Sequence, residues 1–436
     1  MQFFNVLTGP ELLEVTEACL PEHRERLYPP TVTLAMFLRQ ALSGDPSCQR
    51  VVNEWAVARM AEGLTAQSVR TGGYCRARAR LPLSMVQALS HESARLLRER
   101  ASPSWQWRGR RVTLLDGTGF SMPDTAANQA RFPQPACQAT GVGFPLARLC
   151  ALIDLSSGAL LEAAVGAHQG KGRSELDLSR TLLPALQRGD LLLADALYAN
   201  YFLVARLLER GVDVLLEQHG SRRTDFRCGE RLGTRDHVVH WPKPRSRPAW
   251  MNPEQYAAAP QTLHLRETKV GGRILVTSLR DAKAVPKAEL DALYRRRWDI
   301  ELDLGCLKTT LGMDVLRCRS PEMIEKELWV YLLAYNLIRL LMAEAATQSG
   351  QRPQQISFKH TLQLWNAWSA PGCAGKSVAD LARLFALIAT VRVGHRPKRS
   401  EPRARKRRPK SYPWLKVPRH VARSRSLALP NWLRAK

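Results

Sequence analysis

The order of apolar segments between residues 111 and 218 constrains the fold of this chain more than any other feature of its sequence. Three strand-like stretches come first, and a Ser-Ser-Gly turn joins the second to the third, which indicates a hairpin. Two helical stretches then alternate with two short apolar strands. The first of these helices begins at Ser174, with Asp177 three residues later as an imperfect capping box. The pattern predicts the order β-β-β-α-β-α-β.

This order is that of the ribonuclease-H-like fold, in which a three-stranded meander precedes alternating helices and strands. It implies an α/β domain with a mixed sheet and helices on its faces. Residues 219–273 interrupt the pattern, because they are rich in Arg, Gly, Pro and Trp and contain short strand-like pieces. We interpret them as a β-rich insertion. Pro286 then opens a long helical stretch that continues to residue 313.

The net charge limits the partners of the chain. It contains 65 Lys and Arg against 39 Asp and Glu, a formal charge of +26. Such an excess costs self-repulsion unless a polyanion such as DNA, RNA or an anionic membrane relieves it. The one stretch long enough to span a bilayer, residues 329–346, contains Asn336, Arg339 and Glu344. We therefore expect a buried core helix there rather than a membrane span.

Cysteine usage and the first residues indicate a cytoplasmic, nucleoid-associated location. The nine cysteines are scattered and include no CxxC pair. Zinc fingers and a disulfide framework are therefore not expected, and a reducing compartment fits. The first residues carry acids early and have no basic segment, so no signal peptide is predicted.

Composition divides the chain into four expected regions. Residues 1–102 have helical periodicity and a basic stretch, which predicts an all-α N-terminal domain that binds DNA. Residues 103–350 form the expected ribonuclease-H-like domain, with the β-rich insertion at about 219–273 inside it. A C-terminal helical region follows at 351–395. Residues 396–436 form a basic tail, interrupted by prolines, that we expect to be disordered when free and drawn to DNA.

Four side chains after Pro286 have the spacing of one helical face. Tyr294, Arg297, Glu301 and Lys308 follow one another at intervals of three, four and seven residues. In a regular helix they occupy an arc of roughly 60° over about 21 Å. One acid among two bases and a phenol suits an acid that binds a metal ion beside groups that hold phosphates. A solvated, salt-bridged helix face is the alternative.

Two aspartates complete this pattern. Asp116 ends the apolar strand VTLL, and Asp195 ends the apolar strand LLLA. The carboxyl ends of neighbouring strands border the crevice in which open α/β sheets bind ligands, and an acid there is costly unless a cation or donor compensates it. Capping of the following turn is the alternative for each aspartate. With Glu301 they predict a site for two Mg²⁺ or Mn²⁺ ions, which could drive an in-line displacement at phosphorus.

The spacing of Tyr294, Arg297, Glu301 and Lys308 resembles the Tyr-Arg-Glu-Lys signature of bacterial insertion-sequence transposases of the IS-four family, a group within the DDE superfamily. Asp116 in LLDGT and Asp195 in LLLADALY are similar to the first and second catalytic aspartates of that family. The resemblance implies metal-dependent cleavage at the terminal inverted repeats of an insertion sequence, followed by strand transfer into target DNA.

The resemblance also implies roles for the other residues. Tyr294 and Arg297 would contact phosphates near the cut, Lys308 would contact the DNA end, and the protein would act as a homodimer in a synaptic complex with double-stranded DNA.

A Trp of the insertion stacks on a flipped base in some relatives, so Trp241 and Trp250 are DNA-binding candidates; a place in the core or on the surface is the alternative for each. Trp298, inside the signature, is expected to pack against the sheet.

Two other functions share parts of this pattern. A non-catalytic DNA-binding protein derived from a transposase would keep the basic surfaces but would have no need of clustered carboxylates. A nuclease that cuts without joining would keep the three acids but would give no strand-transfer product.

Overall fold

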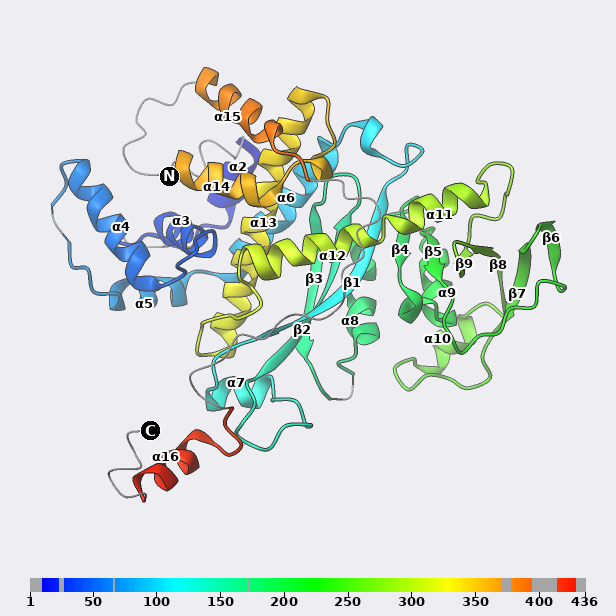
Figure 1. The fold of residues 1–436 in the computed structure, drawn as a ribbon, viewed down its shortest axis with the longest axis horizontal. Helices are drawn as coiled ribbons and strands as arrows, with labels where there is room; N and C mark the ends of the chain where they lie inside the picture. Colours follow the sequence, from blue (N-terminus) through cyan, green and yellow to red (C-terminus); the bar gives the residue numbers. More distant parts are fainter. Residues whose placement is uncertain are drawn as a thin grey trace.

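The computed structural model describes residues 10–22, 27–65, 67–170, 172–369, 378–393 and 414–428 (Figure 1). Within them, nine strands form one mixed sheet with the order β3-β2-β1-β4-β5-β9-β8-β7-β6. The strands are β1 (Val112–Ser121), β2 (Leu146–Asp154), β3 (Leu160–Ala167), β4 (Leu191–Ala194), β5 (Asp213–Glu217), β6 (Glu230–Gly233), β7 (Asp236–Pro242), β8 (Thr262–Val270) and β9 (Arg273–Thr277).

The first five strands have the predicted connection. β1 pairs antiparallel with β2, and β2 pairs antiparallel with β3, while β1, β4 and β5 run parallel to one another. Helices α8 (Glu175–Leu182) and α9 (Tyr201–Glu209) lie in the two crossovers. Ser174 caps α8, and its capping box with Asp177 is complete. The mixed α/β, ribonuclease-H-like fold class is therefore confirmed.

The β-rich insertion extends this sheet. β9 pairs antiparallel with β5, and β8, β7 and β6 follow as successive antiparallel strands toward the far edge. A short helix, α10 (Pro253–Ala258), connects β7 to β8. The insertion shares an apolar layer with α8 and α9, on the face of the sheet opposite to that of the long C-terminal helices.

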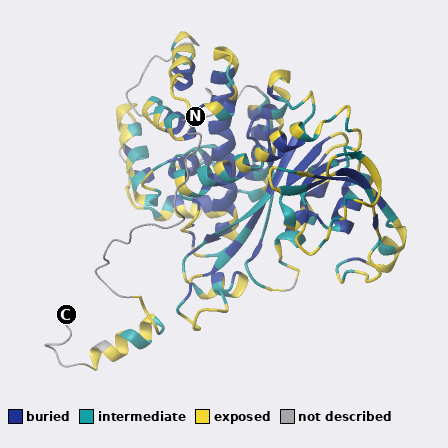
Figure 2. Cartoon of the chain, turned by 45° about the vertical axis from the view of Figure 1, so that its right-hand side comes forward, coloured by how far each residue is buried: buried dark blue, intermediate teal, exposed yellow. Residues whose placement is uncertain are grey.

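A helical layer packs against the other face and end of the sheet. Its centre is α13 (Pro321–Ser349), which is long and apolar enough to cross a membrane, but 94% of its apolar window is buried in the protein. The expectation of a core helix is confirmed, and Figure 2 shows buried residues concentrated along the sheet and the helices packed on it. The helices around α13 are α2 (Pro10–Ala18), α3 (Pro30–Ala41), α4 (Cys48–Ala61), α5 (Gly72–Arg80), α6 (Leu83–Glu99), α14 (Phe358–Trp368) and α15 (Val378–Thr390).

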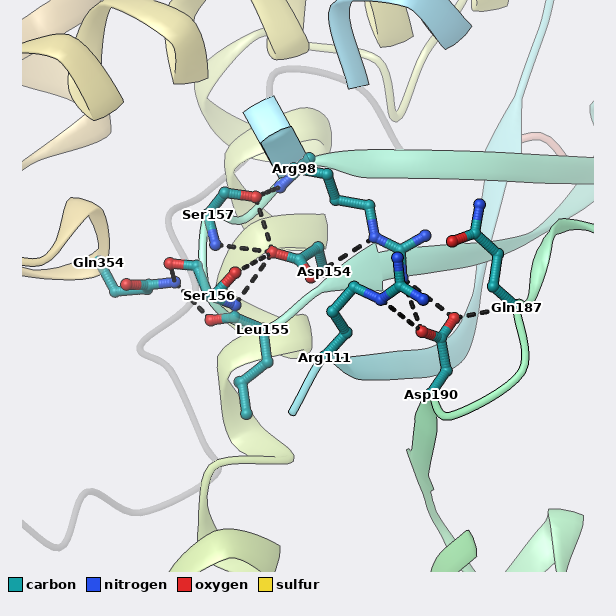
Figure 3. A network of polar contacts seen from close by, with 10 residues as sticks. Arg98, Arg111, Asp154, Leu155, Ser156, Ser157, Gln187, Asp190 and Gln354 are labelled. Atoms are coloured by element: carbon teal, nitrogen blue, oxygen red, sulfur yellow. Dashed lines mark hydrogen bonds and ion pairs between the residues drawn. The ribbon is translucent and has the colours of Figure 1, made fainter. Parts of the chain in front are cut away.

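A buried carboxylate joins the N-terminal helices to the sheet (Figure 3). Asp190, directly before β4, is fully buried and lies 3.0 Å from Arg98 of α6 and 2.9 Å from Arg111. It also accepts the backbone N–H of Gln187 at 2.9 Å. Both oxygens are thus occupied by charged or polar donors, which offsets the cost of removing the carboxylate from water.

The neighbouring Asp154 closes the turn between β2 and β3. One of its oxygens accepts the N–H groups of Ser156 and Ser157 at 3.1 and 2.9 Å. The other lies 4.0 Å from Arg98. Arg98 therefore contacts an acid on each side of the start of β1, at the end of β2 and directly before β4.

The basic tail differs from the prediction where it can be described. Residues 394–413 and 429–436 lie outside the described residues. Between them, α16 spans Arg419–Leu427, although we expected prolines to prevent a helix there. The helix begins directly after Pro418 and contains no proline itself. No residue within it therefore interrupts the helical hydrogen bonds as an internal proline would.

Replacement of Asp190 by Ala should destabilise the fold. It leaves Arg98 and Arg111 without their shared anion, and the expected loss is roughly 3 kcal/mol in the free energy of unfolding, since Arg111 is partly exposed. Urea denaturation followed by circular dichroism measures this loss. Asp225→Ala, which breaks an exposed pair with Arg227, is the matched control and should leave the midpoint unchanged. An equal effect of both substitutions would contradict the role of Asp190.

Candidate active site

The pairing of three parallel strands sets three carboxylates in a row. The β1–β4 pairing ends at Leu115 and Ala194, and the next residues of these strands are Asp116 and Asp195. The β4–β5 pairing brings Glu217 into the same position of the next strand. Adjacent strands lie about 4.8 Å apart, and residues at paired positions project from the same face. The sequence predicted the two aspartates, but it did not single out Glu217, the last residue of β5. Asp195 directly follows β4, whereas β1 does not end at Asp116 as expected but continues to Ser121 beside β2.

The row faces the helices that carry the signature. Each acid has a leucine two residues before it: Leu114, Leu193 and Leu215. These leucines belong to the apolar core that includes residues of α11 (Lys287–Arg295), α12 (Trp298–Gly305) and α13. Because side chains alternate along a strand, the acids project toward the same face. Glu301, on the covering helix, is therefore brought toward Asp116 of β1.

The stretch opened by Pro286 is not the uninterrupted helix that we predicted. It forms α11 (Lys287–Arg295), a tight turn at residues 296–297, α12 (Trp298–Gly305) and a π-helical turn at Cys306–Thr310. At the tight turn, the N–H groups of Arg296 and Arg297 bond to carbonyls three residues back. Both irregularities change the rotation per residue. Tyr294, Arg297 and Glu301 still face the same group of acids across the tight turn, as predicted. The π-helical turn changes the rotation only at Lys308.

Arg297 lies between Asp116 and Glu301. Its guanidinium approaches Oδ2 of Asp116 at 3.8 Å and Oε1 of Glu301 at 3.1 Å. One cationic group thus connects the acid on β1 to the acid on α12. Asp195 has a different partner, since its Oδ1 accepts the N–H of Leu197 at 2.8 Å and caps the following turn. The capping role considered for Asp195 is therefore present.

The electrostatic environment disfavours a charged Asp116. Burial raises the pKa of Asp116 to about 6, the N–H of Gly117 opposes this shift, and the charges of Glu175 and Asp195 add to it. A carboxylate that is partly desolvated and surrounded by other carboxylates gains most from a nearby cation. Such a site attracts positive charge.

The donor chemistry fits hard divalent cations, and the Arg297 guanidinium already occupies a place for positive charge between two of the acids. In this conformation, no three acidic, His or Cys side chains of the described part of the chain are close enough to hold a metal ion. Binding of ions by Asp116, Asp195 and Glu301 together therefore requires Arg297 to move away from Asp116.

A comparison with known families is consistent with this geometry. Residues 107–337 match the family model described as Transposase DDE domain. This segment is more than half of the chain and contains all three predicted acids. The chain belongs to the DDE transposase family.

One relative extends this assignment over nearly the whole length. The transposase InsG for insertion sequence element IS4 of Escherichia coli (strain K12) is 28% identical over 418 residues, covering 92% of this chain and 91% of that protein. The resemblance to the IS-four group is confirmed. A cryo-EM structure of the piggyBac transposase synaptic complex with hairpin DNA aligns with 99% of this chain and 91% of its own, at 10% identity and a TM-score of 0.43, which is too distant to carry an argument.

The other two signature residues of the transposase have contrasting environments. Tyr294 is 1% exposed, and its hydroxyl donates to Oε2 of Glu217 at 3.2 Å. Lys308 is partly exposed in the π-helical turn. In this conformation Tyr294 therefore positions Glu217 from inside the protein, while Lys308 remains accessible. Their contacts with DNA stay predictions.

The transposase places its two insertion tryptophans differently. Trp241 is 1% exposed and donates through Nε1 to Glu267 at 2.8 Å, so in this conformation it offers no ring face to a base. Trp250 is half-buried, and the guanidinium carbons of Arg180 and Arg206 lie 4.2 and 4.8 Å from its ring centroid. Trp250 thus lies at a basic surface, whereas Trp241 belongs to the core.

The expectation that Trp298 packs against the sheet is wrong, because its side chain is 50% exposed. Helix α12 turns Ile300 and Leu304 into the core instead. Asp303, two residues beyond Glu301, forms a buried ion pair with Arg339 of α13. This pair fixes the rotation of α12, and with it the direction in which Glu301 points.

The raised pKa of Asp116 predicts a specific pH dependence of stability. Protonation of Asp116 favours the folded state, and this stabilisation is complete below the pKa of an unfolded aspartate, roughly 3.9. It is lost as the pH rises through about 6. Above about pH 6, Asp116→Asn in EDTA should therefore be more stable than the parent and melt at a higher temperature. The expected gain in the free energy of unfolding is up to a few kcal/mol, at about 1.4 kcal/mol per pKa unit.

Melting temperatures of the two proteins between about pH 4 and pH 8 measure this difference. The gap should close toward the acidic end, where Asp116 is protonated in the parent. A gap that is independent of pH would contradict the assigned environment of Asp116.

Proposed function

We propose that this transposase cleaves DNA at the terminal inverted repeats of its own insertion sequence and joins the ends to target DNA, with Asp116, Asp195 and Glu301 holding divalent metal ions. The observation that carries the proposal is the placement of the other two acids relative to Asp116. Asp195 lies at the same level of the adjacent parallel strand, directly beyond the last β1–β4 pair, and Glu301 is tied to Asp116 through Arg297.

The residues of the chain have distinct parts in this reaction. Two bound Mg²⁺ or Mn²⁺ ions would supply activation of the attacking water or 3′-hydroxyl and stabilisation of the leaving oxygen. Arg297, once its contact with Asp116 is released, keeps Glu301 in place and can donate to a phosphate oxygen, for which its planar fork is suited. Lys308 holds the DNA end further along the same helical segment.

Basic surfaces outside the site supply affinity for double-stranded DNA. In α5, Arg76 and Arg80 are exposed, whereas Arg78 turns inward, donates to Gln40 at 3.0 Å and lies over Phe37. The N-terminal helices thus present arginines that can contact phosphates without reading bases. The tail, with its excess of Lys and Arg, adds to this term. A synaptic homodimer would bring two element ends together in the cytoplasm.

The test is a cleavage and joining assay with labelled ends of the element that encodes this chain, a target plasmid and Mg²⁺. The parent should nick and join, and EDTA should stop both steps. Asp195→Ala should lower the cleavage rate by about 10³ or more, since a lost metal ion removes several kcal/mol of transition-state stabilisation. Its DNA affinity in a gel-shift assay should stay within a factor of about two, because the substitution removes no cationic contact.

The outcomes separate the three candidate functions. Asp225→Ala, an exposed acid in the insertion, serves as the control and should cleave like the parent. Metal-dependent nicking without joining would indicate a nuclease. DNA binding without any metal-dependent nicking would indicate a non-catalytic DNA-binding protein.

A further inference from the structure

Glu175, the first residue of α8, lies against β1 directly beside Asp116. A Cβ atom built on Gly117 would lie 2.5 Å from Cδ of Glu175 and 2.7 Å from its Oε2. No side chain at position 117 could share that space with the carboxylate. The missing Cβ of Gly117 therefore allows Glu175 to approach the strand that carries the first catalytic aspartate.

Tyr198 fixes the orientation of this carboxylate. The Tyr198 side chain is buried, and its hydroxyl donates to Oε1 of Glu175 at 2.7 Å. Tyr198 belongs to the short turn that Asp195 caps, so one turn positions both acids. Oε2 of Glu175 is left without an ion pair or hydrogen bond from the residues that the structure describes.

Charge makes this arrangement unexpected for a purely structural acid. Lys and Arg outnumber Asp and Glu by 65 to 39 in the chain, yet no described Lys or Arg pairs with Glu175 or Asp195. Arg297, at the start of α12, lies 3.8 Å from Asp116 on one side. On the Glu175 side, Asp116 has no cationic partner among the residues that the structure describes.

β1 has a free edge next to Asp116. β4 ends at Ala194, whereas β1 continues to Ser121 with β2 on its other side only. Asp116 and Gly117 are consecutive, so their side-chain directions point to opposite faces of the sheet. Asp116 thus lies on the α12 face of this free edge, and Glu175, which packs on Gly117, lies on the α8 face.

We propose that Glu175 is a fourth carboxylate of the active site, which ligates one divalent cation together with Asp116 while Tyr198 positions it. The inference rests on the proposed function, in which Asp116 holds that cation. The alternative role for Glu175 is structural, because an acid in the first turn of a helix interacts favourably with the helix dipole.

Calorimetric titration of the full chain with Mn²⁺ alone, without DNA, tests the proposal. Glu175→Gln should raise the apparent dissociation constant for Mn²⁺ at least about tenfold. Glu209→Gln, the same change at the exposed end of α9, should leave it unchanged. Gly117→Ala retains the carboxylate but displaces it, so this variant should also weaken Mn²⁺ binding. Tyr198→Phe should produce a smaller change in the same direction.

Thermal melting in EDTA distinguishes a ligand from a structural acid. If Glu175 is a ligand, Glu175→Gln relieves repulsion and should melt at the same or a higher temperature than the parent. A lower melting temperature in EDTA with unchanged Mn²⁺ affinity would assign Glu175 to the helix terminus and overturn the proposal.

The same titration separates this inference from the proposed function. Equal Mn²⁺ affinity in Glu175→Gln and the parent, with loss of binding in Asp195→Ala, would overturn the role of Glu175 and leave the proposed function standing. A parent protein that binds no Mn²⁺ would overturn both.

Discussion

The site depends on the register of three parallel strands. β1, β4 and β5 are paired so that an acid stands at the same level of each; β4 and β5 end there, whereas β1 continues to Ser121. A slip of one residue would turn every side chain of the slipped strand to the opposite face. The buried leucines on both faces oppose such a slip, because it would exchange the members of two separate apolar cores. The apolar pattern that stabilises the sheet therefore also aligns the carboxylates.

Two sets of ion pairs offset the repulsion among the aligned acids, one inside the site and one beside it. Arg297 lies between two of the acids, and the buried pair of Asp303 with Arg339 holds α12 in place two residues beyond Glu301. Acids brought together in this way repel one another, and the surrounding packing keeps them there. A site that is unfavourable without cations is well suited to bind them, because ion binding removes the repulsion.

The same framework connects the site to the helices proposed to bind DNA. Arg98 of α6 reaches Asp190 before β4 and lies near Asp154 at the end of β2, while α13 belongs to a core shared by the N-terminal helices and the sheet. The basic α5 is attached to α13 by Lys326, whose ammonium group donates to the carbonyls of Arg78 and Ala79. Such contacts favour a fixed relation between the phosphate-binding arginines and the carboxylates.

The sequence by itself determined the element order, the two aspartates at strand ends, the buried nature of α13 and the spacing that identifies the family. These features follow from local periodicity and from short-range turn chemistry, which a linear pattern records. The interruption of the helix at Arg296 and Arg297, the exposure of Trp298 and the burial of Trp241 depend on which side of each element meets the core. Only the tertiary structure decided these, and only it brought Glu217 level with Asp195 and Glu175 to Asp116, because pairing between strands and packing of α8 over Gly117 join residues that the sequence keeps far apart.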